Sequence, residues 1–361
     1  MPQAQTSARP LAWLYAALIV YASLYPFGPW RDQGIAPWSF VTAPPSPYWT
    51  GFDVGANFLG YVPLGFWVSV AFLRLGQTQG AWWRGLLVSA MLSFGLEAMQ
   101  SYLPMRVPSQ IDWLLNTLGG GVGAGLAQAM ERCGVLLRYS AMRKRWFIVH
   151  THGALPLLIT WPLALLFPLT IPLGLGQVQE RAHAALQPWL SGTALWQWWP
   201  LPHAWTPLTP ATTAWCVCLG LWVPVLLAYT VIQHPGRRLL ALFLLLVSAV
   251  GVTSLSVALS YGPLQAWSWL DDTATAGLLG GMVLGLVALV LPLRFCLVLL
   301  LPVAIWHWML VNQAPPNSYF EETLRVWEQG RFIRFNGLAQ WLGWLWPLAL
   351  MADLMRRLLR P

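Results

Sequence analysis

Two stretches of the sequence begin with the same pair of polar residues. Asp53 precedes Asn57 by four residues, and Asp112 precedes Asn116 by four residues, both within the pattern D-x-x-x-N-x-L-G. Residues four apart lie on one face of a helix, so each pair predicts a carboxyl beside an amide near the start of a helix. Such groups can bind the hydroxyl groups of a ligand or exchange protons with it.

A further polar pair lies between these two stretches. Glu97 and Gln100 are three residues apart and share a helix face, and Arg106 follows in a short loop. We therefore expect three consecutive helices to bring seven polar residues to one outward-facing pocket. The seven are Asp53, Asn57, Glu97, Gln100, Arg106, Asp112 and Asn116.

Three kinds of chemistry suit these residues. One carboxyl kept protonated by burial and a second one kept ionised can hydrolyse or transfer a glycosyl or phosphoryl group. The same residues can instead only bind a ligand, with Asp and Asn on sugar hydroxyls and Arg106 on a lipid phosphate. In the third interpretation, Asp53, Asp112 and Arg106 form a buried ion group that holds the helices together. Motifs of serine hydrolases, zinc proteases and phosphate-binding loops are absent, so catalytic residues stay unassigned and binding is slightly favoured.

The composition is typical of an integral membrane protein. Of the 361 residues, 57% are hydrophobic and 9% are charged, whereas about a quarter of the residues of a soluble protein are charged. The expected fold class is an all-α polytopic transmembrane bundle, in which buried acids and bases usually serve a function. A span needs about 20 mainly apolar residues. We place ten spans at residues 11–29, 53–73, 84–103, 112–131, 147–174, 212–232, 238–260, 272–292, 295–311 and 338–355.

The distribution of basic residues predicts the orientation of these spans. With the N-terminus inside, most of the 20 basic residues lie in cytoplasmic loops, where membrane proteins concentrate Lys and Arg. Both termini are then cytoplasmic, and the expected location is the bacterial inner membrane. The net charge of +8 is thus explained by topology, and no soluble basic domain suggests nucleic-acid binding.

The cysteines do not indicate a disulfide framework or a metal centre. Cys216 and Cys218 are two residues apart, so on a helix they point in different directions. We expect them, with Cys133 and Cys296, to pack as small apolar residues. The sequence predicts neither a metal nor another cofactor.

Tryptophan and proline are concentrated in two outer loops, residues 30–52 and 176–211. Interfacial anchoring at the lipid headgroups is the first interpretation, and stacking on sugar rings or a lipid-linked ligand is the second. Residues 319–336 predict a helix lying in the interface. Its basic residues Arg325, Arg331 and Arg334 are candidates for contacts with lipid headgroups.

Parts of the sequence recur about 159 residues later. Residues 101–104 (SYLP) correspond to residues 260–263 (SYGP), and Asp112 corresponds to Asp271. The alternative explanation of these matches is that both stretches share the composition of membrane helices and are not copies of each other. In this alignment Glu97 corresponds to Ser256, so the second copy has lost most of its polar residues. We predict three domains: a four-helix membrane domain at 1–131, a degenerate copy at 132–293, and two C-terminal membrane helices at 294–361.

The spacing of the polar motifs resembles that of the VanZ-like membrane protein family over residues 11–131. The resemblance rests on YASLYPF at residues 21–27, on D-x3-N-x2-G-x2-PLG from Asp53, and on S-x3-E-x2-Q-x3-P-x-R from Ser93. It also includes D-x3-N-x2-G from Asp112. The family's polar positions map onto the seven residues named above. The resemblance implies a link to glycopeptide (teicoplanin) resistance, as in the founding member, while the family's biochemical activity is not settled.

The predicted function combines these observations. We expect a protein that binds or handles a lipid or a lipid-linked cell-envelope glycan, and that affects teicoplanin susceptibility. The expected partners are membrane lipids or such a glycan. The alternatives are a membrane-embedded hydrolase or transferase acting on such a lipid, and a structural scaffold without a ligand.

Overall fold

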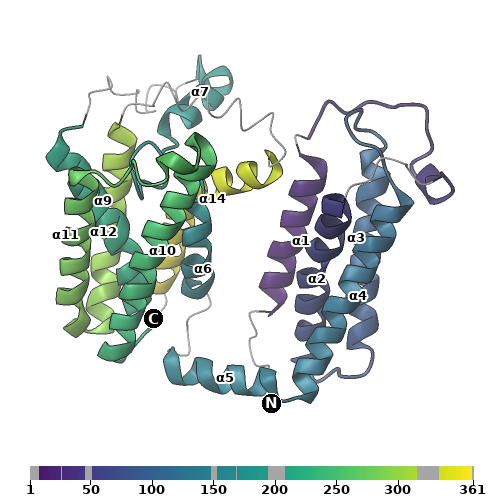
Figure 1. The fold of residues 1–361 in the computed structure, drawn as a ribbon, viewed down its shortest axis with the longest axis horizontal. Helices are drawn as coiled ribbons and strands as arrows, with labels where there is room; N and C mark the ends of the chain where they lie inside the picture. Colours follow the sequence, from purple (N-terminus) through teal and green to yellow (C-terminus); the bar gives the residue numbers. More distant parts are fainter. Residues whose placement is uncertain are drawn as a thin grey trace. The chain divides into compact units, whose positions relative to one another are not determined.

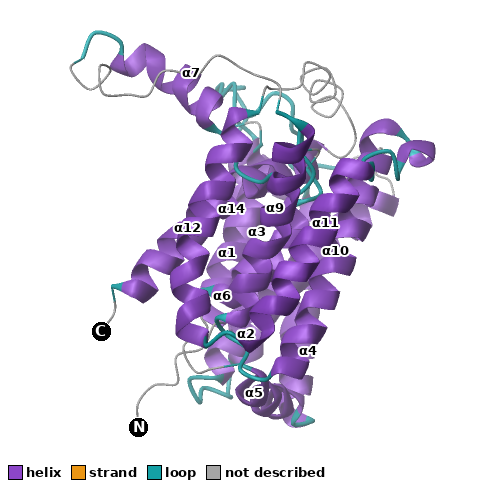
Figure 2. Cartoon of the chain, turned by 90° about the vertical axis from the view of Figure 1, so that its left-hand side faces the viewer, coloured by secondary structure: helices purple, strands orange, loops and turns teal. Residues whose placement is uncertain are grey.

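The computed structural model describes residues 8–25, 27–44, 51–147, 153–167, 169–193, 208–314 and 333–359. Throughout these ranges the regular elements are helices joined by loops (Figure 2). The chain divides into two compact units, Met1–Arg143 and Lys144–Pro361. The all-α class of a helical membrane protein is thus confirmed.

The N-terminal unit contains four helices that run side by side (Figure 1). They are α1 (Ala8–Leu24), α2 (Gly51–Leu73), α3 (Ala81–Gln100) and α4 (Gln110–Arg132). A short 3-10 helix, η1 (Ser39–Val41), lies in the loop after α1, and α5 (Val135–Trp146) runs crosswise to α3 and α4. Because α2 and α4 run antiparallel to α3, their first residues and the last residues of α3 lie at the same end of this unit.

Glycines on α4 allow this helix to pack directly against the backbone of α2. A Cβ added to Gly119 would overlap the carbonyl oxygen of Phe58, and one added to Gly123 would overlap that of Val62. Such small residues let membrane helices approach closely and pack by van der Waals contact. Helices α2 and α4 are therefore in direct backbone contact.

The C-terminal unit is built around one central helix. Its elements are α6 (Ala154–Ala164), α7 (Gln179–Leu190), α9 (Pro210–Tyr229), α10 (Pro235–Tyr261), η2 (Pro263–Gln265), α11 (Asp272–Val287), η3 (Ala288–Val290), α12 (Leu293–Gln313) and α14 (Ile333–Leu358). Nearly all side chains of α9 from Cys216 onward are buried. Helices α6, α10, α11 and α12 pack around it.

In the C-terminal unit, α11 packs against α9 in the same way as α4 packs against α2 in the N-terminal unit. On α11, a Cβ added to Gly277 would lie 2.5 Å from Ala214 O, and one added to Gly281 would lie 2.9 Å from Cys218 O. The glycines and the carbonyls are each four residues apart, as they are between α4 and α2. Asp271, which the sequence alignment pairs with Asp112, is the N-cap of α11, whereas Asp112 lies within the first turn of α4. The three-domain division stays a prediction.

The fifth predicted span, residues 147–174, is wrong as a single helix. Helix α6 ends at Ala164, and Leu173 adopts a left-handed backbone conformation with φ of 62°. Asn312 fixes the end of this buried non-helical segment: its Oδ1 accepts hydrogen bonds from Val178 N at 3.0 Å and Gln179 N at 2.9 Å. Non-helical backbone is tolerated at membrane depth when protein groups satisfy its hydrogen bonds.

Each of the other nine predicted spans overlaps one helix of the structure. Within the described ranges, five helices are long and apolar enough to cross a membrane, namely Asp53–Leu73, Pro210–Tyr229, Pro235–Tyr261, Asp272–Val290 and Leu293–Gln313. Two shorter apolar helices are Ala8–Leu24 and Ala154–Ala164. The count of ten spans therefore stays a prediction.

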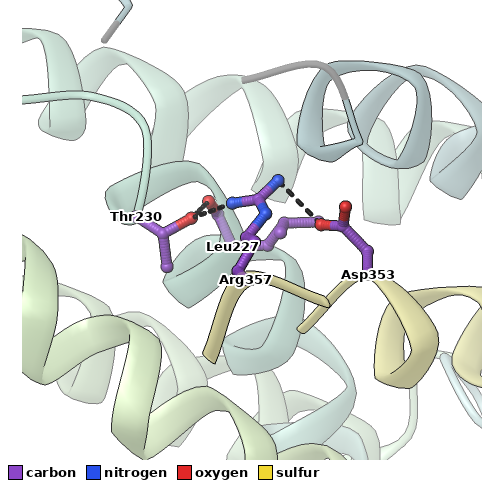
Figure 3. Close-up of polar contacts among 4 residues, drawn as sticks. All are labelled: Leu227, Thr230, Asp353 and Arg357. Carbon is purple, nitrogen blue, oxygen red and sulfur yellow. Dashed lines mark hydrogen bonds and ion pairs between the residues drawn. The ribbon is translucent and has the colours of Figure 1, made fainter. Parts of the chain in front are cut away.

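Near the C-terminal end of α14, an ion pair between two of its own residues lies between the end of α9 and the start of α6 (Figure 3). Arg357 lies 2.7 Å from the Asp353 carboxyl and donates a hydrogen bond to Thr230 Oγ1 just after α9. A Cβ added to Gly153 would overlap Asp353, so this carboxyl lies at the N-terminus of α6. The anion thus faces the positive end of one helix dipole and the cation faces the negative end of another.

Arg238 closes one end of the same unit. Its side chain is 3% exposed, and its guanidinium donates to the carbonyls of Tyr229, Ile232, Leu289 and Leu291 at 2.7–3.1 Å. These carbonyls lie in or just after the last turns of α9 and η3, where helix ends leave acceptors without partners.

Replacing Arg238 by lysine is expected to lower the melting temperature of the purified protein. Lysine keeps the charge but lacks the planar fork that reaches several carbonyls at once. Each hydrogen bond lost from a charged group costs about 1.5–3 kcal/mol. Thermal unfolding in detergent measures the effect, with Arg294→Lys as the control because Arg294 is exposed. Equal melting temperatures for the two variants would contradict this role of Arg238.

Candidate functional site

Three acidic side chains lie in the same region of the N-terminal unit, at the end where α2 and α4 begin. The Asp112 carboxyl interacts electrostatically with both Asp53 and Glu97, and the Asn57 side chain donates a hydrogen bond to it. These four residues, called the acidic cluster below, come from α2, α3 and α4. The structure thus brings together the first residues of both D-x-x-x-N motifs with Glu97, as the sequence predicts.

The start of α4 holds two of these acids in place. Ser109 is the N-cap of α4, and its Oγ accepts hydrogen bonds from Ile111 N at 3.2 Å and Asp112 N at 3.5 Å. The backbone N–H of Ser109 donates to Glu97 Oε2 at 2.9 Å. Both carboxyls therefore face the positive end of the α4 dipole, which stabilises negative charge. Glu97 has a structural contact in addition to its place in the acidic cluster.

Asn116 extends the polar region one turn deeper. Its Nδ2 donates a hydrogen bond to Ser93 Oγ at 2.9 Å, and the Tyr61 and Ser93 hydroxyls are also hydrogen-bonded to each other. All three side chains are buried. Asn116 therefore lies beneath the acidic cluster and links α4 to α2 and α3.

Gln100 and Arg106 are directed to the end of α1 instead. Gln100 Nε2 donates to Ser23 O at 3.0 Å, and Arg106 Nη2 donates to Tyr25 O at 2.8 Å. In the part of the chain that the structure describes, no ion pair joins Arg106 to Asp112. In the predicted ion group of Asp53, Asp112 and Arg106, the contact between Arg106 and Asp112 is therefore wrong. The loop before α4 places Arg106 against the Tyr25 carbonyl, just after the end of α1, where helix ends leave carbonyls without partners.

The acidic cluster opens toward one end of the unit. Asp53 is exposed, Asn57 and Asp112 are half-buried, and Glu97 is 5% exposed. A ligand approaching this end would meet Asp53 first and the Asp112 carboxyl next.

The helices that carry these polar residues lie in a part of the chain that matches a known protein family. Residues 5–131 match the VanZ/LLP1 family model. The matched range contains all of α1 to α4 except Arg132, and all seven polar residues predicted from the sequence. We call residues 5–131 the VanZ-like unit. The resemblance seen in the sequence is thus confirmed.

The comparisons extend no further than the VanZ-like unit. No curated protein was found to match the chain. No solved structure was found to match it either.

Metal ligands are not grouped in the described parts of the chain. No three His, Cys, Asp or Glu side chains there are placed to hold a metal ion.

The sequence analysis did not include Ser109 or Ser93 among the site residues, although Ser93 begins one of its motifs. Ser109 precedes Asp112 by three residues, which is the spacing of an N-cap and an acid in the first turn of a helix. Ser93 precedes Glu97 by four residues and therefore shares its helix face. Both signals are present in the sequence of the VanZ-like unit.

The structure does not describe the side chains of the predicted headgroup residues in the C-terminal segment. Arg325 and Arg331 lie outside the described residues, and the side chain of Arg334 is not described. The interfacial helix at 319–336 stays a prediction, although α14 already begins at Ile333.

Proposed function

We propose that the acidic cluster of the VanZ-like unit binds the polar group of a lipid or of a lipid-linked cell-envelope glycan. The observation that carries this proposal is the meeting of Asp53, Asn57, Glu97 and Asp112 from three helices. Carboxylates accept hydrogen bonds from hydroxyl groups, and amides both donate and accept them, so the set suits a hydroxylated headgroup or sugar. In this proposal the protein lies in the bacterial inner membrane, both termini are cytoplasmic and the cluster faces outward.

Exposed apolar side chains on α2 and α4 suit a unit that lies in a membrane. Leu59 is 65% exposed, Leu114 is 52% exposed and Leu118 is 57% exposed, all near the starts of α2 and α4. Exposed leucines on a membrane helix suit contact with lipid chains.

Analysis of co-purified lipids tests this proposal. We expect full-length protein purified in mild detergent to retain a lipid or lipid-linked glycan, detectable by mass spectrometry, and we expect the Asp112→Asn variant to lose it. Asp32→Asn is the matched control, because Asp32 is an exposed acid in the loop after α1 and Gly34 N donates to its carboxyl. Identical lipid profiles for all three proteins would argue for a scaffold without a ligand.

One observation favours an enzyme as the second candidate. Glu97 and Asp112 interact but differ in exposure, and two carboxyls in unlike environments can act as acid and base. The reaction would be hydrolysis or transfer of a glycosyl or phosphoryl group of the bound lipid. Incubating the purified protein with the lipid that it retains distinguishes the candidates. If the protein is an enzyme, the wild type should convert the lipid into a product and the Glu97→Gln variant should not. If it only binds the lipid, both proteins should leave the lipid unchanged.

A further inference from the structure

Beneath the acidic cluster, one face of α3 carries a line of small and polar residues. Gly85, Ser89, Ser93 and Glu97 follow one another at four-residue intervals and therefore share a helix face. Ser89 and Ser93 are fully buried, and Glu97 is 5% exposed. We call these four residues, with Asn116 opposite Ser93 on α4, the polar seam.

Two atoms of the polar seam have no hydrogen-bond partner among the described residues. They are Ser89 Oγ and Asn116 Oδ1, and both are fully buried. Exchanging the amide nitrogen and oxygen of Asn116 would only leave the nitrogen without a partner instead, because Ser93 Oγ can bond to one end alone. Buried polar atoms of this kind destabilise a protein unless a small molecule satisfies them.

The packing around Ser89 limits the size of that molecule. A Cβ added to Gly120 of α4 would overlap the Ser89 side chain, so α3 and α4 meet closely there. Ser89 also lies two turns below Glu97, away from the mouth of the acidic cluster. A molecule bound in such a place must be smaller than a lipid headgroup, and it must both donate and accept hydrogen bonds.

We propose that the polar seam binds internal water at Ser89 and Asn116. A water molecule donates to Asn116 Oδ1 and exchanges hydrogen bonds with Ser89 Oγ, so it satisfies both kinds of atom. Hydration then reaches two turns below the acidic cluster into the bundle. This inference is independent of the ligand proposed for the cluster, because it concerns atoms buried beneath it.

Solid-state NMR on the full chain in liposomes tests the proposal. With asparagine labelled by 15N, polarisation transferred from water should reach the Asn116 side-chain amide, which is assigned by its absence in Asn116→Leu. We expect Ser89→Ala to reduce this transfer and to lower the melting temperature, because the water loses a partner. The Asn57 amide, half-buried in the acidic cluster, is the positive control for water contact.

Two results would overturn the proposal. One is a folded wild-type protein in which Asn57 receives polarisation from water and Asn116 does not. The other is a Ser89→Ala variant that melts at or above the wild-type temperature, because removing a hydroxyl that binds nothing relieves a destabilising group. Loss of the co-purified lipid in Ser89→Ala is not expected, so this test is separate from the test of the acidic cluster.

Discussion

A Gly123→Ala variant is expected to lose most of the stability of the VanZ-like unit. The added methyl group would overlap the carbonyl oxygen of Val62, a backbone atom that cannot move without shifting α2. Overpacking of this kind costs about 3 kcal/mol or more when backbone must move. The shift would also displace Asp53 and Asn57 on α2 from Asp112 on α4. Both the yield of folded protein and its melting temperature should fall.

Gly125 supplies the matched control on the same helix. A Cβ added there would meet Trp82 at 3.6 Å, which is an ordinary contact. Because alanine favours a helix more than glycine by about 1 kcal/mol, Gly125→Ala should be neutral or stabilising. Equal melting temperatures for the two variants, measured by thermal unfolding in detergent, would show that α2 and α4 are not packed as closely as the structure has them.

An Asp112→Asn variant is expected to fold normally and to fail in cells. Asparagine keeps the shape of the side chain, and its Oδ1 can still accept the hydrogen bond from Asn57. It removes the negative charge at the centre of the acidic cluster, so the proposed ligand loses its strongest acceptor. When a deletion strain expresses this variant at the wild-type protein level, we expect the strain to stay as susceptible to teicoplanin as it is without the gene.

Stability and complementation must be measured on the same variants. Asp32→Asn should restore the strain fully, and Asp53→Asn should behave like Asp112→Asn. If Asp112→Asn melts early but still complements, the acids serve the helix bundle and the ligand hypothesis is lost. Breaking a buried polar contact usually costs several kcal/mol, so a structural role would be visible in the melting curve.

The sequence predicted the parts of this protein that depend on local patterns. Apolar runs located most helices, and the shared D-x-x-x-N spacing placed Asp112 near Asp53, because identical motifs at the starts of two helices put their acids at one end of the bundle. The glycines of α4, among them Gly119 and Gly123, are likewise visible in the sequence as small residues that allow close packing. These features need no knowledge of distant contacts.

Features that depend on distant contacts were missed. Arg106 bonds to Tyr25, which precedes it by 81 residues, so its direction follows from the loop geometry and not from its neighbours in the sequence. Asn312 on α12 accepts hydrogen bonds from Val178 N and Gln179 N at the start of α7, a contact between residues more than 130 positions apart. The short helices α5 and α7 were missed as well, because both are too polar to resemble spans. Hydropathy alone does not report such features.

The dependence of residues 165–178 on later parts of the chain sets an order for assembly during synthesis. The N–H of Val178 donates to Asn312 Oδ1, which lies 134 residues further along the chain. The N–H of Gly176 donates to Gly343 O at 2.8 Å. Neither acceptor exists until the ribosome has made that part of the chain. Chains enter the membrane from the N-terminus, and unpaired backbone groups are costly in hydrocarbon. The segment after α6 must therefore stay near water or a translocation partner until α12 and α14 have been inserted. A ribosome stalled before residue 312 should leave this segment open to proteases, and completion of the chain should close it.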